Sequence, residues 1–482
     1  MVDERLTTMA HLLRRAGFGS SRDELEEFSA RPYEEVVDDL VNPERFEPLD
    51  EDALERFYPH IFSNKDNPGI WNGRWFWRMV NTRRPLEEKM TLFWHHVFAT
   101  GWTKSEHTPS MVDHIEMFRK NGLANFRTLL LDLSRDPAMS FWLDNSENHG
   151  NAPNENYGRE LLELFSMGIG TYDEPDVKDA ARAFTGWTFE QPLPLYPFGH
   201  YDARFEFRPE DHDNTDKTFL GVTGNLNGED IIDIIVKQEA TARFICRHIY
   251  NFFVADEPQI PAWSVTPPQD EAAIDVLVKA YMDSDADIRT VMKTLFLSDF
   301  FKEARGRRVK CPAEFIAGTI KLSGEFREIE PGLPTLDSAS IVMGQKLMDP
   351  PTVEGWHTGK EWIDGGTLTE RINFATSRVQ DPDTPGTRAI INRLSGSGDP
   401  ITPVELVNGV LDLAGPIEAG EDTCLPAPAR RQLWEVMGRP ERIVYAYDHR
   451  ATFMAMTFLG GGSLQKEAFR FLKKVFGMTL GG

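Results

Sequence analysis

The chain has 482 residues, with 76 acidic and 52 basic side chains and a net charge of −24 at pH 7. So large an acidic excess argues against nucleic acid or an anionic membrane surface as a partner, because both require a basic face. It fits attraction of cations, or simply a solvated acidic surface. The three cysteines are isolated along the chain, so neither a disulfide framework nor a cysteine zinc site is expected.

The sequence shows no segment that would direct the chain into a membrane. It contains no run of about 18 apolar residues, so no membrane insertion is predicted. The first residues, MVDERLTTMAHLLRRAGFG, lack the apolar core of a signal peptide. We therefore expect a cytoplasmic protein, although a chain trimmed of its leader would look the same.

Helical periodicity dominates from the first residues onward. Apolar residues recur at spacings of three and four, often after a Ser, Asp or Pro that can begin a helix. A single core stops growing near about 250–300 residues, so this length predicts one large body with subdomains, or two packed lobes. The predicted helical segments are 9–19, 21–30, 32–41, 84–100, 111–122, 125–143 with a break near Pro137, 152–167, 174–184, 228–254, 270–284, 287–301 and 311–324.

The pattern changes in two places. Between about 188 and 228, prolines, glycines and the weak alternation YDARFEF predict a long loop with a short β-hairpin, long enough to act as a lid. Residues 379–403 are rich in Pro, Gly, Asp and Ser and look like a linker, and 404–482 is expected to be helical and to pack on the main body of residues 1–378. The predicted fold class is therefore predominantly α, a multi-helical globular body with a short β-hairpin and long-loop insertion.

The segment LFWHHVFAT places His95 and His96 side by side on a predicted helix. Neighbours on a helix diverge by about 100° around its axis, so the two imidazoles cannot easily share one ion. One histidine can point into a site while the other lies at its edge. Alternatively, both are hydrogen-bonded members of an aromatic core.

The loop DNSENHGNAPNE alternates polar oxygens, and Glu155 is the twelfth residue counted from Asp144. This spacing is similar to an EF-hand loop, but His149 holds the sixth position and Pro153 interrupts the loop. Three interpretations remain open. The loop is a calcium site, a looser oxygen-lined cation site, or a polar loop in which Asn154 caps the next helix.

The helix that follows has two distinct faces. Its apolar stripe contains Tyr157, Leu161, Leu164 and Phe165. The other face carries Asn156, Glu160 and Glu163, while Arg159 can pair with Glu155 or Glu163. As surface ion pairs these contacts would be worth only about 0.3–0.5 kcal/mol each. If the acids are buried they need partners, and a histidine from the 84–100 helix would complete an acid/base pair or a metal cluster.

Two loops contain further candidates. In HDNTDKTFLG, His212, Asp213 and Lys217 either close over a site or form local side-chain turns. In PPTVEGWHTGKEWI, Trp356 and Trp362 form a rigid aromatic loop that either stacks on a sugar ring or apolar ligand, or plugs a core. The common hydrolase, dinucleotide, P-loop and HExxH motifs are absent from the sequence.

Taken together, several motifs resemble the bacterial family catalogued as domain of unknown function 1800. They occur in the expected order and cover nearly the whole chain up to about residue 378. The motifs are HLLRRAGFG, EKMTLFWHHVFAT, NFRTLLLDLSRDPAM, LDNSEN, APNENYGRELLELFSMGIGTY, DVKDAARAFTGW, HDNTDKTFLG, PPTVEGW and EWI. The resemblance carries no settled activity. It implies a partner from a second, sulfatase-like family, domain of unknown function 1501, whose members are often found beside this one.

The chain departs from the family pattern at two positions. The family carries His-Asn-His or His-Gly-His after Phe-Trp, whereas Val97 stands here in place of the second histidine. Some relatives carry a histidine at the position of Phe165. Both departures weaken a histidine-rich metal site. The matching positions are His95, Asn154, Glu155, Asn156, Arg159, Glu160, Glu163, Trp187, His212, Asp213 and Lys217.

These observations lead to one leading hypothesis and one rival. The leading hypothesis is an enzyme-like protein with a buried Glu/His/Arg pocket that acts on a small or sugar-like substrate by acid/base chemistry, with or without a divalent cation. Glu160 or Glu163 would be the base, His95 its partner, Arg159 the orienting cation and Lys217 an electrophile, with His212 in the covering loop. A cation would be held by Asp144, Glu155, Glu160 and His95. The rival is a non-catalytic binding or assembly protein in which the polar hairpin is structural.

Overall fold

The computed structural model describes residues 3–59, 67–190, 202–379, 381–395, 409–410 and 412–415. Helices predominate in these ranges, and strands form only two two-stranded sheets there. The predominantly α fold with a short β-hairpin insertion is therefore confirmed. Most of the predicted C-terminal helical segment, 404–482, lies outside the described residues. Within the described ranges, no helix combines the length and the apolar character that crossing a bilayer requires.

The first part of the chain is a series of helices whose ends follow the sequence signals. The predicted break near Pro137 is confirmed, because one helix ends at Ser134 and Asp136 begins the next by accepting a hydrogen bond from the backbone N–H of Met139 at 2.8 Å. Ser21 and Glu24 form a capping box. The elements are α1 (Glu4–Arg15), α2 (Arg22–Ser29), α3 (Tyr33–Val41), η1 (Pro43–Arg45), α4 (Asp52–Phe57), α6 (Pro68–Asn81), α7 (Pro85–Val97), α8 (Trp102–Ser105), α9 (Thr108–Asn121), α10 (Phe126–Ser134) and α11 (Pro137–Trp142).

The middle of the chain contains the predicted insertion. The first hairpin pairs Trp187 with Phe207 and includes part of the YDARFEF stretch, as expected. A second hairpin, which pairs Lys217 with Gly224, was not predicted. Residues 191–201 of the predicted loop lie outside the described residues. The elements are η2 (Asn145–Glu147), α12 (Asn156–Glu163), α13 (Glu174–Ala183), β1 (Trp187–Glu190), β2 (Arg204–Phe207), η3 (Pro209–Asp211), β3 (Lys217–Phe219) and β4 (Val222–Gly224).

The last part is again helical, and it extends into the segment that looks like a linker. Residues 385–395 form a helix whose Ile390 packs with Leu322 and Val379 in a small second apolar cluster. Part of the predicted linker is therefore folded. The elements are α14 (Gly228–Ile235), α15 (Glu239–Phe253), η4 (Ile260–Ser264), α16 (Glu271–Asp283), α17 (Ile288–Leu297), α18 (Asp299–Glu303), α19 (Pro312–Ser323), α20 (Pro334–Val342), η5 (Gly359–Trp362), α21 (Gly365–Val379) and α22 (Pro385–Ser395).

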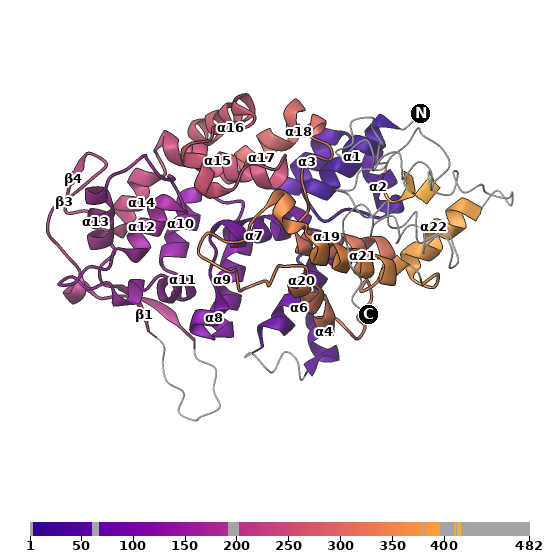
Figure 1. The fold of residues 1–482 in the computed structure, drawn as a ribbon, viewed down its shortest axis with the longest axis horizontal. Helices are drawn as coiled ribbons and strands as arrows, with labels where there is room; N and C mark the ends of the chain where they lie inside the picture. Colours follow the sequence, from indigo (N-terminus) through magenta and orange to yellow (C-terminus); the bar gives the residue numbers. More distant parts are fainter. Residues whose placement is uncertain are drawn as a thin grey trace.

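One continuous apolar core runs through the molecule, from Met9 to Ala375. In Figure 1 the helices α10, α12, α13 and α14 gather at one end of the long axis, and α1, α2 and α22 lie at the other. Helix α7 runs between them, and every residue of it except Pro85 and Glu87 is buried. The histidine-bearing helix is therefore a central element of the core.

A buried ionic cluster ties two distant helices, α1 and α7, and the loop just before α19 to α19 itself. Glu314 contacts Lys89 of α7 and Arg308 at 2.6 Å each, and Arg15 of α1 at 3.8 Å. Its carboxylate is 2% exposed. Burial alone would raise the pKa of Glu314, but Arg308, Lys89 and Arg15 outweigh that effect and hold the pKa well below its usual range. Glu314 is therefore a permanently charged structural group.

Candidate functional site

Helix α12 carries the predicted acids on a firmly packed base. Its predicted stripe is buried as expected, with Tyr157, Leu161, Leu164 and Phe165 each at most 9% exposed. Gly158 faces α13, where a Cβ atom would lie 3.0 Å from the backbone nitrogen of Ala181. Two helices can approach this closely only without a side chain at that position. The position of α12 is thereby fixed.

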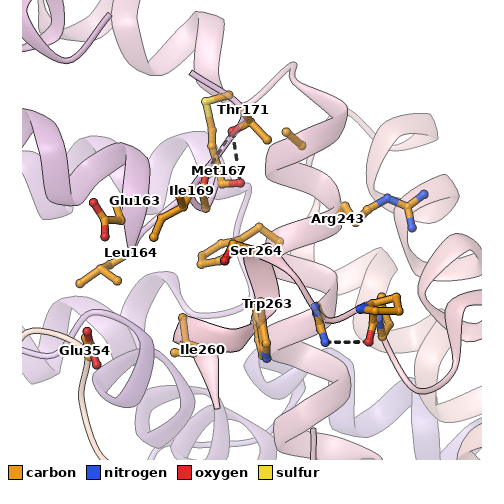
Figure 2. Close-up of a pocket in the computed structure, with 16 residues that line it drawn as sticks. Glu163, Leu164, Met167, Ile169, Thr171, Arg243, Ile260, Trp263, Ser264 and Glu354 are labelled. Carbon is orange, nitrogen blue, oxygen red and sulfur yellow. Dashed lines mark hydrogen bonds between the residues drawn. The ribbon is translucent and has the colours of Figure 1, made fainter. Parts of the chain in front are cut away.

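A pocket opens at the C-terminal end of α12. It has a volume of about 270 Å³ and lies between the turn that follows α12, the first half of α15, and η4. Its apolar walls are formed by Leu164, Met167, Phe244, Ile260 and Trp263. Figure 2 shows Glu163 and Glu354 on one side of this pocket and Arg243 on the other.

The turn after α12 shapes one wall of the pocket. Gly168 has a φ of +74°, and the ring of Phe244 packs directly on it, 2.8 Å from where a Cβ atom would stand. Both the backbone conformation and the close ring contact require glycine here. Thr171 closes the turn by donating a hydrogen bond to the carbonyl of Gly168 at 3.1 Å.

Three carboxyl groups gather beside the pocket without cationic partners. Glu163 and Glu354 line it, and Glu160 lies one turn before Leu164 on α12. Among the described residues, none of these three side chains makes a hydrogen bond or an ion pair. Burial raises the pKa of Glu160 to about 7, and the nearby charges of Glu163 and Glu354 add to the rise against the opposing effect of Arg159.

The two arginines in the pocket wall are already neutralised. Arg247 contacts the buried carboxylate of Glu257 at 2.8 Å and donates to two backbone carbonyls. Arg243 contacts Asp275 at 2.8 Å and Glu239 at 3.7 Å. The unbalanced charge of the pocket is therefore negative.

Three of the four residues predicted to hold a cation, Asp144, Glu155 and His95, make other contacts. Arg159 joins Glu155 at 3.2 Å and Glu174 at 2.8 Å, which links α12 to the start of α13. Asp144 pairs with Lys104 at 2.5 Å. His95 lies in the core. Across the described ranges, no group of three or more His, Cys, Asp or Glu residues is placed so that it could hold a metal ion. The predicted set of Asp144, Glu155, Glu160 and His95 is not brought together.

The loop that resembles an EF-hand is held by its amides instead. Asn145 donates to the carbonyl of Trp187 at 3.0 Å, and Asn148 donates to that of Ala181 at 2.9 Å. Both asparagines are 2% exposed. Asn154 accepts a hydrogen bond from the backbone N–H of Asn156 at 3.0 Å, at the start of α12. These contacts match the polar-loop interpretation, but Asn154 is not the N-cap of α12: that position is Glu155, whose side chain makes no capping hydrogen bond, and Asn154 lies one residue before it.

His95 is completely buried and belongs to the aromatic core. Its Nε2 accepts a hydrogen bond from the backbone N–H of Met348 at 2.9 Å, so Nδ1 carries the proton. Burial lowers the pKa of His95 well below its usual value. The Trp356 ring lies 5.2 Å from the His95 ring and 6.2 Å from that of His96. Trp356 thus plugs the core, and the loop that carries it also carries Glu354 of the pocket lining.

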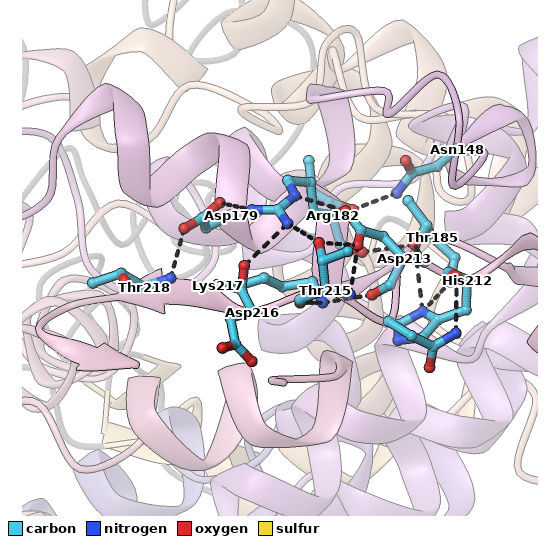
Figure 3. A network of polar contacts seen from close by, with 12 residues as sticks. Asn148, Asp179, Arg182, Thr185, His212, Asp213, Thr215, Asp216, Lys217 and Thr218 are labelled. Atoms are coloured by element: carbon cyan, nitrogen blue, oxygen red, sulfur yellow. Dashed lines mark hydrogen bonds and ion pairs between the residues drawn. The ribbon is translucent and has the colours of Figure 1, made fainter. Parts of the chain in front are cut away.

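His212, Asp213 and Lys217 belong to a separate polar network on α13 (Figure 3). Arg182 lies at its centre and contacts Asp213 at 2.7 Å. The buried ammonium group of Lys217 donates to the carbonyls of Asp213 at 2.6 Å and Thr215 at 3.0 Å. His212 donates from Nδ1 to the carbonyl of Thr185 at 2.8 Å. These contacts satisfy each group locally and fasten the segment before β3 to α13.

The sequence indicated some members of the pocket and missed others. Glu163, which lines the pocket, and Glu160, which lies beside it, were selected from the face of α12. Glu354 lies in the PPTVEGW motif, where only the aromatic residues drew attention. Phe244 and Trp263 follow α12 by about 80 and 100 residues, and no local pattern connects them to it.

Comparisons with known proteins support the resemblance seen in the motifs. Neither the curated proteins nor the solved structures gave a match to this chain. The family model described as "Protein of unknown function (DUF1800)" matches residues 11–473, nearly the full length. The chain therefore belongs to the family of domain of unknown function 1800.

Proposed function

We propose that the protein is an enzyme-like protein whose small ligand occupies the pocket beside α12. The observation that carries this proposal is a concave apolar space of about 270 Å³ with unpaired carboxyl groups along one side. Ligand sites are typically apolar hollows with a few polar groups that fix orientation. The size is close to the lower end of such sites, which favours a small ligand.

Glu160 is the group best suited to proton transfer. A general acid or base works best when its pKa lies near the working pH, and the pKa of Glu160 is raised to about 7. It can therefore accept or release a proton at neutral pH. Glu163 and Glu354 would contact the ligand, and Arg159 would hold Glu155 and Glu174 at the start of the α12–α13 hairpin.

A cation-assisted version of this chemistry is a narrower proposal. Carboxylate oxygens are the ligands that a hard divalent cation prefers, but Glu160, Glu163 and Glu354 are not placed to hold one by themselves, so a bound substrate would have to supply the other ligands. Because the described residues form no ready metal-binding group, the acid/base role of Glu160 is proposed without a step through the ion.

The test is a ligand screen against a matched pocket variant. Ala240 lines the pocket and is half-buried, so Ala240→Phe should fill the space without disturbing the core. Thermal unfolding is measured for both proteins with a broad library of small compounds. We expect compounds that raise the Tm of the wild type and not of the variant. Failure of every compound, or equal stabilisation of the filled variant, would overturn the proposal.

A second candidate function, as a binding or assembly protein, is favoured by the network around Arg182. Because His212, Asp213 and Lys217 are all satisfied within it, they have a structural role in this interpretation. A partner from the family of domain of unknown function 1501 is the specific form of this candidate. Co-expression and pull-down of the two proteins tests it, and a complex that survives Ala240→Phe would separate assembly from ligand binding.

A further inference from the structure

We propose that the pocket beside α12 selects ligands that carry a positive charge on an apolar body, such as alkylammonium or guanidinium compounds. This inference rests on the proposed ligand-binding function and adds the charge class of the ligand. It follows from which charges in the pocket are already paired, from the apolar lining, and from the surroundings of the pocket mouth.

The charges that face the pocket leave a negative excess. Both arginines in its wall are held by acids, Arg247 by Glu257 and Arg243 by Asp275. Glu163 and Glu354 have no side-chain partner among the described residues. An entering anion would therefore meet two unpaired carboxylates and, among the described residues that line the pocket, no unpaired cation, whereas an ammonium or guanidinium group would supply the missing partner.

Groups from several elements face Glu160, and most of them favour an added cation. Glu163 follows it on α12, and Glu354 approaches from the loop before η5. Tyr172 lies close by, and burial and Glu163 raise its pKa to about 12, so it stays uncharged. Among the described residues, Arg159 is the cation that acts on Glu160, and it is already paired with Glu155 and Glu174.

The rest of the pocket suits an apolar body. Leu164, Met167, Phe244 and Ile260 offer carbon surface below the carboxyl groups. Ile169 lines the pocket and is 55% exposed, and Val265, next to the lining residue Ser264, is 83% exposed. Exposed aliphatic side chains at a pocket mouth extend the apolar contact area that a ligand can cover.

The charge class can be tested with three probes of nearly equal shape. n-Hexylammonium, 1-hexanol and hexanoate share a six-carbon chain and differ in charge. Titration calorimetry at pH 8 should show that n-hexylammonium binds most tightly, 1-hexanol less tightly and hexanoate most weakly. The dissociation constants of the first and the last should differ at least tenfold. The affinity for n-hexylammonium should fall between pH 8 and pH 6 as Glu160 takes up a proton, and that for 1-hexanol should not.

Matched variants assign the effect to the carboxyl groups. Glu163→Gln and Glu354→Gln should each lower the affinity for n-hexylammonium several-fold and leave the affinity for 1-hexanol unchanged. Glu303→Gln is the control, since Glu303 is exposed on α18 and does not line the pocket. Equal affinity for all three probes, or tighter binding of hexanoate, would overturn the charge class while leaving the pocket function intact.

Because a six-carbon chain need not match the shape of the pocket, the library screen provides a second measurement. The compounds whose stabilisation disappears in Ala240→Phe are sorted by net charge, and a majority of cations supports the inference. A majority of neutral or anionic compounds refutes it. A blocked Leu-Lys-Leu peptide, measured beside n-hexylammonium, shows whether the cation is supplied by a free amine or by a protein side chain.

Discussion

Two helical glutamates of this protein, Glu314 and Glu160, have pKa values that are shifted in opposite directions. Glu314 is buried among three cations, which hold its pKa well below the usual range. Glu160 is less buried and makes no ion pair with any residue in the described part of the chain, and its pKa is raised to about 7. Burial penalises the charge of both groups, so the difference comes from their partners. A buried carboxylate such as Glu314, whose cationic partners are all present, has a structural role. A carboxyl group such as Glu160, which lies beside a pocket without a cationic partner, belongs to a candidate site.

The largest expected effect comes from breaking the completed cluster. Glu314→Gln leaves Lys89, Arg308 and Arg15 buried without their shared carboxylate, so the free energy of unfolding should fall by about 3–5 kcal/mol. Urea unfolding at pH 7 measures the change. Glu303→Gln, on the surface, should stay within about 0.5 kcal/mol. A loss below about 1 kcal/mol for Glu314→Gln would remove the contrast between the two glutamates.

His96 extends the comparison between Glu314 and Glu160 to a third case, a buried titratable group that stays uncharged in the folded protein. Burial and the nearby charge of Arg308 lower its pKa to about 4, while the unfolded chain binds a proton near pH 6.5. Its contribution to stability is therefore complete above pH 6.5 and is lost as the pH falls, by about 2–3 kcal/mol at pH 4.5. The slope of the free energy of unfolding against pH reports how many protons the chain takes up on unfolding. In His96→Phe that number should fall by up to one in the range between pH 4 and pH 6.5. An unchanged slope would contradict this assignment.

Lys217 tests whether the network on α13 is structural. Lys217→Met leaves two backbone carbonyls without their donor, so the expected loss is about 1–2 kcal/mol in urea unfolding. The affinity of any ligand that occupies the pocket should not change. If ligand binding were lost while stability stayed normal, Lys217 would have to be counted among the ligand-binding residues rather than the structural ones.

The smallest expected effect has the opposite sign. The pKa of Glu160 is raised on folding, so its carboxyl group destabilises the folded protein increasingly as the pH rises from about 4.5 to 7. Glu160→Gln removes this cost and should stabilise the protein by about 1 kcal/mol at pH 8, a value reduced for the partial solvent exposure of the group. No gain is expected at pH 4.5. Destabilisation at pH 8 would show that Glu160 has a partner.

Much of the fold could be predicted because its signals are local. The Ser cap at residue 21, the break at Pro137 and the apolar stripe of α12 each depend on residues within about two helical turns. The second hairpin, β3 with β4, was missed because three-residue strands give too little alternation to detect.

The candidate site could be predicted only in part. Glu160 and Glu163 share a helix face, which the sequence displays. Their relation to Glu354 and Trp263 depends on tertiary packing that no spacing encodes. His95 was expected to meet the carboxyl groups directly, but its ring packs against Trp75 and Trp356, and its hydrogen bond goes to the backbone of Met348. The partners of Lys217 are backbone carbonyls, which sequence patterns do not reveal.

Gly158 sets the location of this chemistry although it takes no part in it. One added methyl group would press on the Ala181 backbone, so α12 would have to move away from α13 by a few tenths of an ångström. Glu160 and Glu163 would move with it, while Glu354 and Trp263, on other segments, would stay. The distances between the acids and the opposite wall of the pocket therefore depend on the absence of a side chain at residue 158. Gly158→Ala offers a way to alter these distances without changing any group that would touch a ligand.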